Sequence, residues 1–293
     1  MSLGPLWDER SNQVEAWLDR WLFSRSSELS VLPELKTMMR YSLLAPCKRF
    51  RPVLYLTALE GLGMARHQGR HGALALECIH TYSLIHDDLP CMDDDDLRRG
   101  QPSAHRKFGE AQAVLTGDAL LTLAFQLLAM DPPSVVGSMV SELARSSGID
   151  GMVAGQLLDM EGHVEGGNLE KLINIHRRKT GGLISCCLAM AGQRAGRGHS
   201  EVASLRELGA SLGLIFQIQD DILDCVSEEG DLGKTVGKDE EQGKLTYSSL
   251  LGLEGAKERL KMEVMKAEEL MNASPLDPAE VKPLLHFLAN RSH

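Results

Sequence analysis

Several absences narrow the class of this protein before any motif is considered. Basic residues do not predominate, because 31 Lys and Arg stand against 41 Asp and Glu, for a formal net charge of −10. A nucleic-acid partner is therefore not expected, since such proteins need a basic surface against phosphates. Runs of the 18 to 20 apolar residues needed to span a membrane are missing. Aromatic residues make up only 4% of the chain and strand-like alternation is rare, which disfavours β-structure.

The cysteine spacing and the N-terminal residues bear on the cellular compartment. The six cysteines form no Cys-x-x-Cys pair and no Cys/His zinc spacing, so reduced thiols are expected. Asp8 and Glu9 stand where a secretory signal would carry Lys or Arg before an apolar stretch. The sequence thus predicts a cytoplasmic protein without a membrane span.

Apolar residues recur with helical spacing in the most regular segments. One stripe consists of Val14, Trp17, Leu18, Trp21 and Leu22, and another of Leu260, Val264, Ala267 and Met271. Residues 118–130 are apolar almost all round, which predicts a helix buried centrally or at a subunit interface and ended by Pro132-Pro133. No shift in composition marks an interdomain linker. We expect an all-α fold with one domain over residues 1–293.

The most informative segment contains six carboxylates within ten positions, between Asp87 and Asp96. A helical pattern precedes it, and Pro90 disfavours helical dihedral angles at Leu89, so Asp87 and Asp88 are predicted near a helix C-terminus. The helix dipole penalises each carboxylate there by about 0.3–1 kcal/mol. A bound cation would offset this cost, and Mg²⁺ prefers such oxygen ligands.

A second acidic cluster follows a helical run that ends near Phe216. Asp220 and Asp224 are one helical turn apart, and Gln217 lies on the same face. Mg²⁺ commonly joins one or two carboxylates to the phosphates of a substrate. Although each cluster alone is also compatible with a solvated surface, the two together predict a phosphate-bearing substrate.

Basic residues that could meet those phosphates lie near both clusters. They are Lys48, Arg49 and Arg51 before a predicted helix, Arg98-Arg99 after the first cluster, Lys179-Thr180, and Lys234, Lys238 and Lys244 in a polar segment. That segment, residues 227–244, is either a solvated linker or a lid in which Lys234 excludes water. The sequence has no Gly-x-x-x-x-Gly-Lys loop and no Gly-x-Ser-x-Gly nucleophile, which disfavours a P-loop and covalent catalysis.

These motifs resemble those of the trans-isoprenyl diphosphate synthases, most closely the bacterial farnesyl diphosphate synthases. Residues 87–99 resemble the family's first Asp-rich motif, and residues 220–224 resemble the second. Residues 48–52 resemble its Gly-Gly-Lys-Arg-x-Arg-Pro segment, except that Pro46-Cys47 replaces the two glycines. The resemblance spans nearly the whole chain.

The resemblance implies a fold, a reaction and a set of site residues. The expected fold is a helical bundle of the isoprenoid synthase type with a central active-site cavity, usually in a homodimer. The reaction is a head-to-tail condensation of isopentenyl diphosphate with an allylic diphosphate, with three Mg²⁺ ions, for which Mn²⁺ is a possible substitute.

The implied metal ligands are Asp87, Asp88, Asp93, Asp220 and Asp224. The implied allylic-substrate residues are Arg98, Lys179, Thr180, Gln217 and Lys234, and the isopentenyl diphosphate residues are Lys48, Arg51, His80 and Arg99. The expected catalytic set is Asp87, Asp88, Asp93, Arg98, Lys179, Asp220 and Lys234.

Product length and reaction class remain open at this point. Tyr82, with its neighbour Ser83, is predicted to limit the product to C15, although Tyr82 could also be ordinary core. A C20-producing geranylgeranyl diphosphate synthase is the nearest alternative. A second alternative is a metal phosphohydrolase that uses His80, His86, Asp87 and His176. A third is a catalytically silent subunit that only pairs with an active synthase.

Overall fold

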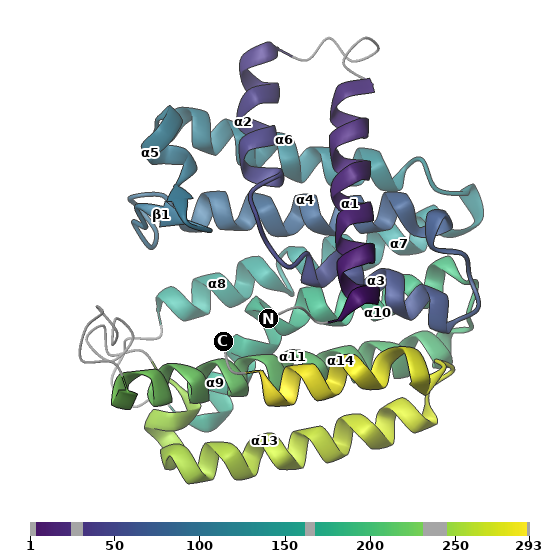
Figure 1. The fold of residues 1–293 in the computed structure, drawn as a ribbon, viewed down its shortest axis with the longest axis vertical. Helices are drawn as coiled ribbons and strands as arrows, with labels where there is room; N and C mark the ends of the chain where they lie inside the picture. Colours follow the sequence, from purple (N-terminus) through teal and green to yellow (C-terminus); the bar gives the residue numbers. More distant parts are fainter. Residues whose placement is uncertain (1–3, 25–31, 162–167, 231–244, 292–293) are drawn as a thin grey trace. The chain divides into compact units, whose positions relative to one another are not determined.

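The computed structural model describes residues 4–24, 32–161, 168–230 and 245–291 (Figure 1). Strands within these ranges are confined to one hairpin, β1 (Leu97–Arg98) with β2 (Gln101–Pro102), and the remaining elements are helices. The predicted all-α fold is confirmed. Contacts divide the chain into an N-terminal unit of residues 2–56 and 65–140 and a C-terminal unit of residues 57–64 and 141–293. The expectation of a single domain stays a prediction.

The N-terminal unit is arranged around α4. Its elements are α1 (Pro5–Ser24), α2 (Pro33–Leu43), most of α3 (Phe50–Gly61), η2 (Arg66–Gly69), α4 (Arg70–Asp87), the β1–β2 hairpin, α5 (Ala104–Phe108), α6 (Glu110–Leu128) and the first half of α7 (Pro133–Ser147). Helices α4 and α6 pack side by side (Figure 1). They can approach closely because Gly117 has no side chain, and a Cβ there would lie only 2.1 Å from Nε2 of His86.

The predicted N-terminal helix is α1, with Val14 and Leu18 buried as expected. The side chains of Trp21 and Leu22 lie outside the described residues. The C-terminal stripe lies in α13, where Ala267 and Met271 are buried. The six cysteines, all within the described residues, form no disulfide, which agrees with the sequence prediction.

Residues 118–130 are not buried on all sides within this chain, so central burial is wrong, and burial at a subunit interface stays a prediction. Asp118, Thr122 and Gln126, each one turn apart on α6, are exposed, because neighbouring elements of the unit cover the opposite side. One turn earlier, Leu115 is 61% exposed. By length and composition α6 could cross a membrane, but its packing against α4 and α5 is that of a core helix.

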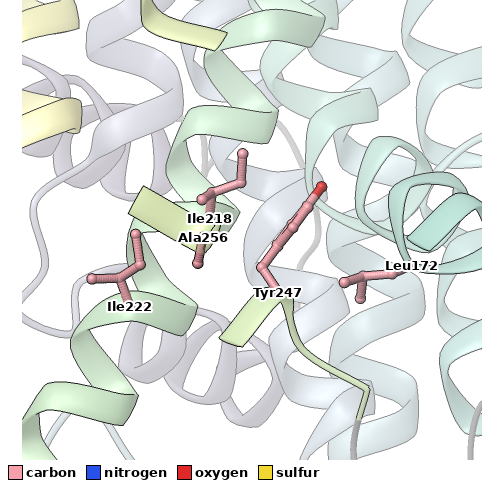
Figure 2. Packing of buried hydrophobic residues seen from close by; sticks show 5 residues of the cluster. All are labelled: Leu172, Ile218, Ile222, Tyr247 and Ala256. Atoms are coloured by element: carbon pink, nitrogen blue, oxygen red, sulfur yellow. The ribbon is translucent and has the colours of Figure 1, made fainter. Parts of the chain in front are cut away.

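The C-terminal unit is arranged around the long helix α11. Its elements are the end of α3, the second half of α7, α8 (Met152–Met160), α9 (Leu169–Lys179), α10 (Gly181–Arg194), α11 (His199–Gly230), α13 (Tyr247–Ala273) and α14 (Pro278–Asn290). Helices α10 and α13 both pack against α11. Figure 2 shows one apolar cluster, in which the ring of Tyr247 lies between Leu172 and the side chains of Ile218 and Ile222.

Candidate active site

The first acidic cluster begins where α4 ends. Asp87 is the last residue of α4 and Asp88 caps it, which confirms the helix end predicted from Pro90. The chain then turns back, and the backbone N–H of Asp93 donates to the carbonyl of Asp87 at 2.9 Å. This turn brings residue 93 beside residue 87 and leaves Asp93 exposed, with Asp87 half-buried.

Asp88 is engaged by an arginine. Its side chain is buried, and Arg98 Nε donates to Asp88 Oδ1 at 2.8 Å while Nη2 donates to the same oxygen. Arg98 Nη2 also donates to Asp95 Oδ2 at 3.1 Å. Burial raises the pKa of Asp88, against the lowering effect of the Arg98 contacts. Arg98 therefore lies within the acidic cluster, and its role in substrate binding stays a prediction.

The hairpin after the cluster carries the second arginine of the pair. Its two-residue turn consists of Arg99 at φ 53° and Gly100 at φ 76°, the positive pair that a type I′ hairpin turn requires. The turn places Arg99 Nη2 3.8 Å from Oε1 of Glu77, on α4.

A cationic cluster lies along α4, two turns before its acidic end. Arg51 Nη1 lies 3.1 Å from Nε2 of His80. Burial, reinforced by the charges of Arg51 and Arg99, holds the pKa of His80 well below its usual value. His80 is therefore neutral near pH 7 and accepts a hydrogen bond from Arg51. Lys48 is exposed, and its carbonyl accepts a hydrogen bond from Trp7 Nε1 at 2.9 Å.

Glu77 is a member of this cluster that the sequence predictions missed. Its carboxylate accepts a hydrogen bond from Arg49 Nη1 at 2.6 Å, and both side chains are buried. A signal was present, because Glu77 interrupts the apolar run between Ala73 and Ile79. A charged residue in such a run requires a buried partner.

In the C-terminal unit, residues from three helices meet beside the second acidic cluster. Thr180 Oγ1 donates to Gln217 Oε1 at 2.6 Å, and Lys179 Nζ donates to Asp159 Oδ2 at 2.6 Å. The second contact depends on close packing of α8 and α9, since a Cβ at Gly155 would lie 2.2 Å from the backbone nitrogen of Lys179. The structure thus brings Lys179, Thr180 and Gln217 together.

The aspartates of the second cluster lie in different surroundings. Asp220 Oδ1 accepts a hydrogen bond from Arg291 Nη2 at 2.8 Å, and Asp224 is exposed. Asp221 Oδ2 instead accepts the backbone N–H of Tyr247 at 2.7 Å, at the start of α13. Arg291 was missed by the sequence analysis, because nothing local marks a residue 71 positions from its partner.

The donor set of each cluster fits Mg²⁺ bound partly by substrate and water. The described residues contain no group of three or more His, Cys, Asp or Glu side chains arranged to hold a metal. The described residues therefore do not bind a metal ion with protein ligands alone. They offer hard oxygen donors in two pairs, Asp87 with Asp93 and Asp220 with Asp224. Mg²⁺ is usually held in proteins by one or two carboxylates together with phosphates.

The predicted chain-length residues lie one turn before the acidic end of α4. Tyr82 is buried, and its ring contacts the His86 ring edge to face at a centroid distance of 5.8 Å. Burial raises the pKa of Tyr82 to about 12. Ser83 is half-buried and donates to the carbonyl of His80 at 3.0 Å. Lys234, Lys238 and Lys244 lie outside the described residues, so the lid hypothesis stays a prediction.

Comparison with known proteins identifies the family. Residues 32–285 match the polyprenyl synthetase family. The chain belongs to this family. A farnesyl diphosphate synthase of Geobacillus stearothermophilus is 43% identical to this polyprenyl synthetase, over 100% of this chain and 99% of the relative. Geranylgeranyl pyrophosphate synthase 7 of Arabidopsis thaliana, which is chloroplastic, is 44% identical over 87% of this chain and 76% of the relative. A geranyltransferase from Legionella pneumophila has a crystal structure similar to this fold, with a TM-score of 0.84, 33% identity, and coverage of 97% and 96%.

Proposed function

We propose that this polyprenyl synthetase is a farnesyl diphosphate synthase, a prenyltransferase that joins isopentenyl diphosphate head to tail to dimethylallyl diphosphate and then to geranyl diphosphate. The observation that carries the proposal is the end-to-end match to a farnesyl diphosphate synthase at 43% identity. The geranylgeranyl synthase has similar identity but matches over a smaller part of both chains. Both acidic clusters are present, which disfavours a silent subunit.

In this proposal, the acidic residues bind the metal ions. Asp87, Asp88 and Asp93, together with Asp220 and Asp224, hold three Mg²⁺ ions directly or through water, and Mn²⁺ can substitute. When bound, the metal stabilises the negative charge that develops on the departing diphosphate, an effect worth several kcal/mol. Asp88 and Asp220 would share their carboxylates with Arg98 and Arg291.

The cationic and polar side chains bind and orient the two substrates. Lys48, Arg51, His80 and Arg99 bind the diphosphate of isopentenyl diphosphate. Arg98, Lys179, Thr180, Gln217 and Lys234 bind the allylic diphosphate. The allylic C–O bond breaks, the isopentenyl double bond forms the new C–C bond, and a proton is lost to the released diphosphate. No protein nucleophile takes part in these steps.

One assay tests the proposal directly. Purified protein is incubated with Mg²⁺, isopentenyl diphosphate and either dimethylallyl or geranyl diphosphate, and the dephosphorylated alcohols are sized by chromatography. A C15 alcohol is the expected product from both starters. A C20 alcohol would support the geranylgeranyl alternative, and absence of any condensation product would contradict both.

The phosphohydrolase alternative has less support from the described residues. His80 contacts Arg51, and His86 Nε2 lies 3.1 Å from the carbonyl of Val114, so both imidazoles are engaged by other groups. Release of inorganic phosphate from nucleotides would favour this alternative.

A cytoplasmic homodimer is part of our proposal, and the exposed Leu115 on α6 supports a subunit contact there.

A further inference from the structure

Glu77 is a buried charge to which the proposed reaction assigns no role. Its side chain is 1% exposed and lies in the middle of α4. Burying an ionised carboxylate is unfavourable unless close partners compensate it. Its partners are Arg49 Nη1 at 2.6 Å, Arg99 Nη2 at 3.8 Å and the Cys47 thiol, whose Sγ lies 3.8 Å from Oε1. Glu77 is thus placed among cations.

Arg49 is fixed from several sides. Its guanidinium is fully buried and also donates to the carbonyl of Ala45 at 3.1 Å and to the half-exposed carboxylate of Glu15 at 3.2 Å. Burial alone would lower the pKa of Arg49, but the charges of Glu77 and Glu15 raise it, so the side chain stays protonated. Arg49 is therefore held as a permanent cation against Glu77.

The two arginines that contact Glu77 share an unusual backbone conformation. Among the described residues other than glycine, positive φ occurs at Arg49 (49°), Arg99 (53°) and Asp94 (48°). L residues rarely adopt this conformation, and it persists where surrounding contacts enforce it. The side chains of Arg49 and Arg99 both meet the buried carboxylate of Glu77, while the positive φ of Arg99 follows from its type I′ turn.

The conformation of Arg49 determines where its neighbours lie. Its carbonyl accepts the N–H of Val53 and so starts the first turn of α3. Lys48 precedes it directly, and Arg51 follows in that first turn, where it meets His80. His80 lies one turn after Glu77 on α4, so both helix residues present the same face to these cations.

We propose that Glu77 is a positioning residue, whose buried carboxylate holds the guanidinium groups of Arg49 and Arg99 and thereby places the cations that bind the diphosphate of isopentenyl diphosphate. This inference rests on the proposed function. Against the carboxylates of Glu77 and Glu15 stand three arginines, Arg49, Arg51 and Arg99, so the cluster keeps a net positive charge and still attracts an anion. Glu77 does not touch the substrate.

Steady-state kinetics of the full chain separate positioning from a merely structural ion pair. Glu77→Gln keeps the size of the side chain and removes its charge. The matched control is Glu142→Gln in the C-terminal unit, because Glu142 is a buried carboxylate that accepts a hydrogen bond from Arg206 Nη2 at 2.7 Å. Glu77→Gln should raise the KM for isopentenyl diphosphate at least tenfold and leave the KM for geranyl diphosphate within twofold. Glu142→Gln should lower the Tm without changing either KM.

A conservative variant keeps the test decisive if Glu77→Gln does not fold. Glu77→Asp retains the charge but shortens the side chain, so its KM for isopentenyl diphosphate should lie between wild type and Glu77→Gln, at least threefold above wild type. An unchanged KM for isopentenyl diphosphate in Glu77→Gln, or in Glu77→Asp when it alone folds, would overturn the inference. So would an equal rise in both KM values.

Failure of the proposed function can be told apart from failure of this inference. If the wild-type protein forms no condensation product, the proposed function is wrong. Calorimetric titration with inorganic diphosphate in EDTA then tests the positioning role of Glu77 without the reaction. The affinity should then fall at least fivefold in Glu77→Gln and stay unchanged in Glu142→Gln. Equal affinity in all three proteins would overturn the positioning role.

Discussion

Asp220 and Asp221 are neighbours on α11, but their side chains have different partners. Asp220 contacts Arg291, whereas Asp221 accepts the first N–H of α13. The pattern Asp-Asp-x-x-Asp alone does not reveal this difference, since every carboxylate in it is chemically equivalent. The structure suggests that Asp221 contributes to stability rather than to metal binding.

Substitution of single aspartates tests this distinction. Asp87→Ala and Asp220→Ala should each lower turnover at least 100-fold, because a proposed metal ligand is lost, while the helical circular dichroism stays unchanged. Asp221→Ala should instead lower the Tm, since a partly buried hydrogen bond at the start of α13 is lost, and keep turnover within tenfold of wild type. Near-normal turnover in Asp87→Ala or Asp220→Ala would contradict the metal assignment.

Tyr82 provides the residue-scale prediction for product length. Tyr82→Ala removes a buried ring next to His86, and the space gained should let the chain grow beyond C15. Chromatography of the dephosphorylated alcohols measures the outcome. Ser83→Ala is the control, because it removes only a hydroxyl bonded to the His80 carbonyl, and its product should remain C15. An unchanged C15 product in Tyr82→Ala would count against the assignment.

Among the elements, the crossing of α10 and α11 positions Thr180 against Gln217. A Cβ at Gly213 would lie 2.6 Å from the Cα of Gly181, so the helices can cross closely only with glycine at this place. Gln217 lies one turn after Gly213, and Thr180 directly precedes Gly181. The hydrogen bond between them therefore depends on the crossing.

Gly213→Ala should separate the two helices and destabilise the protein by about 1–3 kcal/mol, as overpacking typically does. The KM for geranyl diphosphate should rise with it. The control is Gly137→Ala on α7, where a Cβ meets nothing within 4 Å and alanine should stabilise the helix by about 0.5–1 kcal/mol. Urea unfolding and steady-state kinetics measure both effects. An unchanged KM in a destabilised Gly213→Ala enzyme would show that the crossing does not position the substrate residues.

His176 on α9 makes the stability of the C-terminal unit pH-dependent. Burial lowers the pKa of His176 to about 4. Below the unfolded pKa of about 6.5, the unfolded chain binds a proton that the folded chain does not, so stability is complete above pH 6.5 and falls as the pH falls towards 4. This amounts to about 2 kcal/mol between pH 7 and pH 5. Urea unfolding should show a correspondingly smaller loss in His176→Gln, and equal losses would contradict the assignment.

At the scale of the whole molecule, the helices were predictable from the sequence, but the ion pairs between distant side chains were not. Apolar spacing indicated α1 and α13, and Pro90 marked the end of α4, because these signals are local. Two ion pairs show the contrast: Glu77 with Arg49, 28 positions apart, and Asp220 with Arg291, 71 positions apart. No local pattern in the sequence encodes either pair. Composition also did not show which face of residues 118–130 is covered within the chain and which is left exposed.

The exposed face of α6 bears on oligomeric state. Wild-type protein should sediment as a dimer, and Leu115→Asp should sediment as a monomer, since a charge would replace an exposed leucine at the proposed contact. Met262→Asp on α13 is the control, because Met262 is 64% exposed and lies away from α6 in the sequence. Sedimentation velocity measures the mass. Monomeric wild-type protein, or equal behaviour of both variants, would exclude this contact.

Helix α4 carries His80 and Asp87 seven residues apart without interruption. The rise of about 1.5 Å per residue sets their axial separation at about 10 Å, and two nearly complete turns return them to one face. An inserted or deleted residue between them would change that spacing and rotate Asp87 by about 100°. Length changes in related chains are therefore not expected between these two positions.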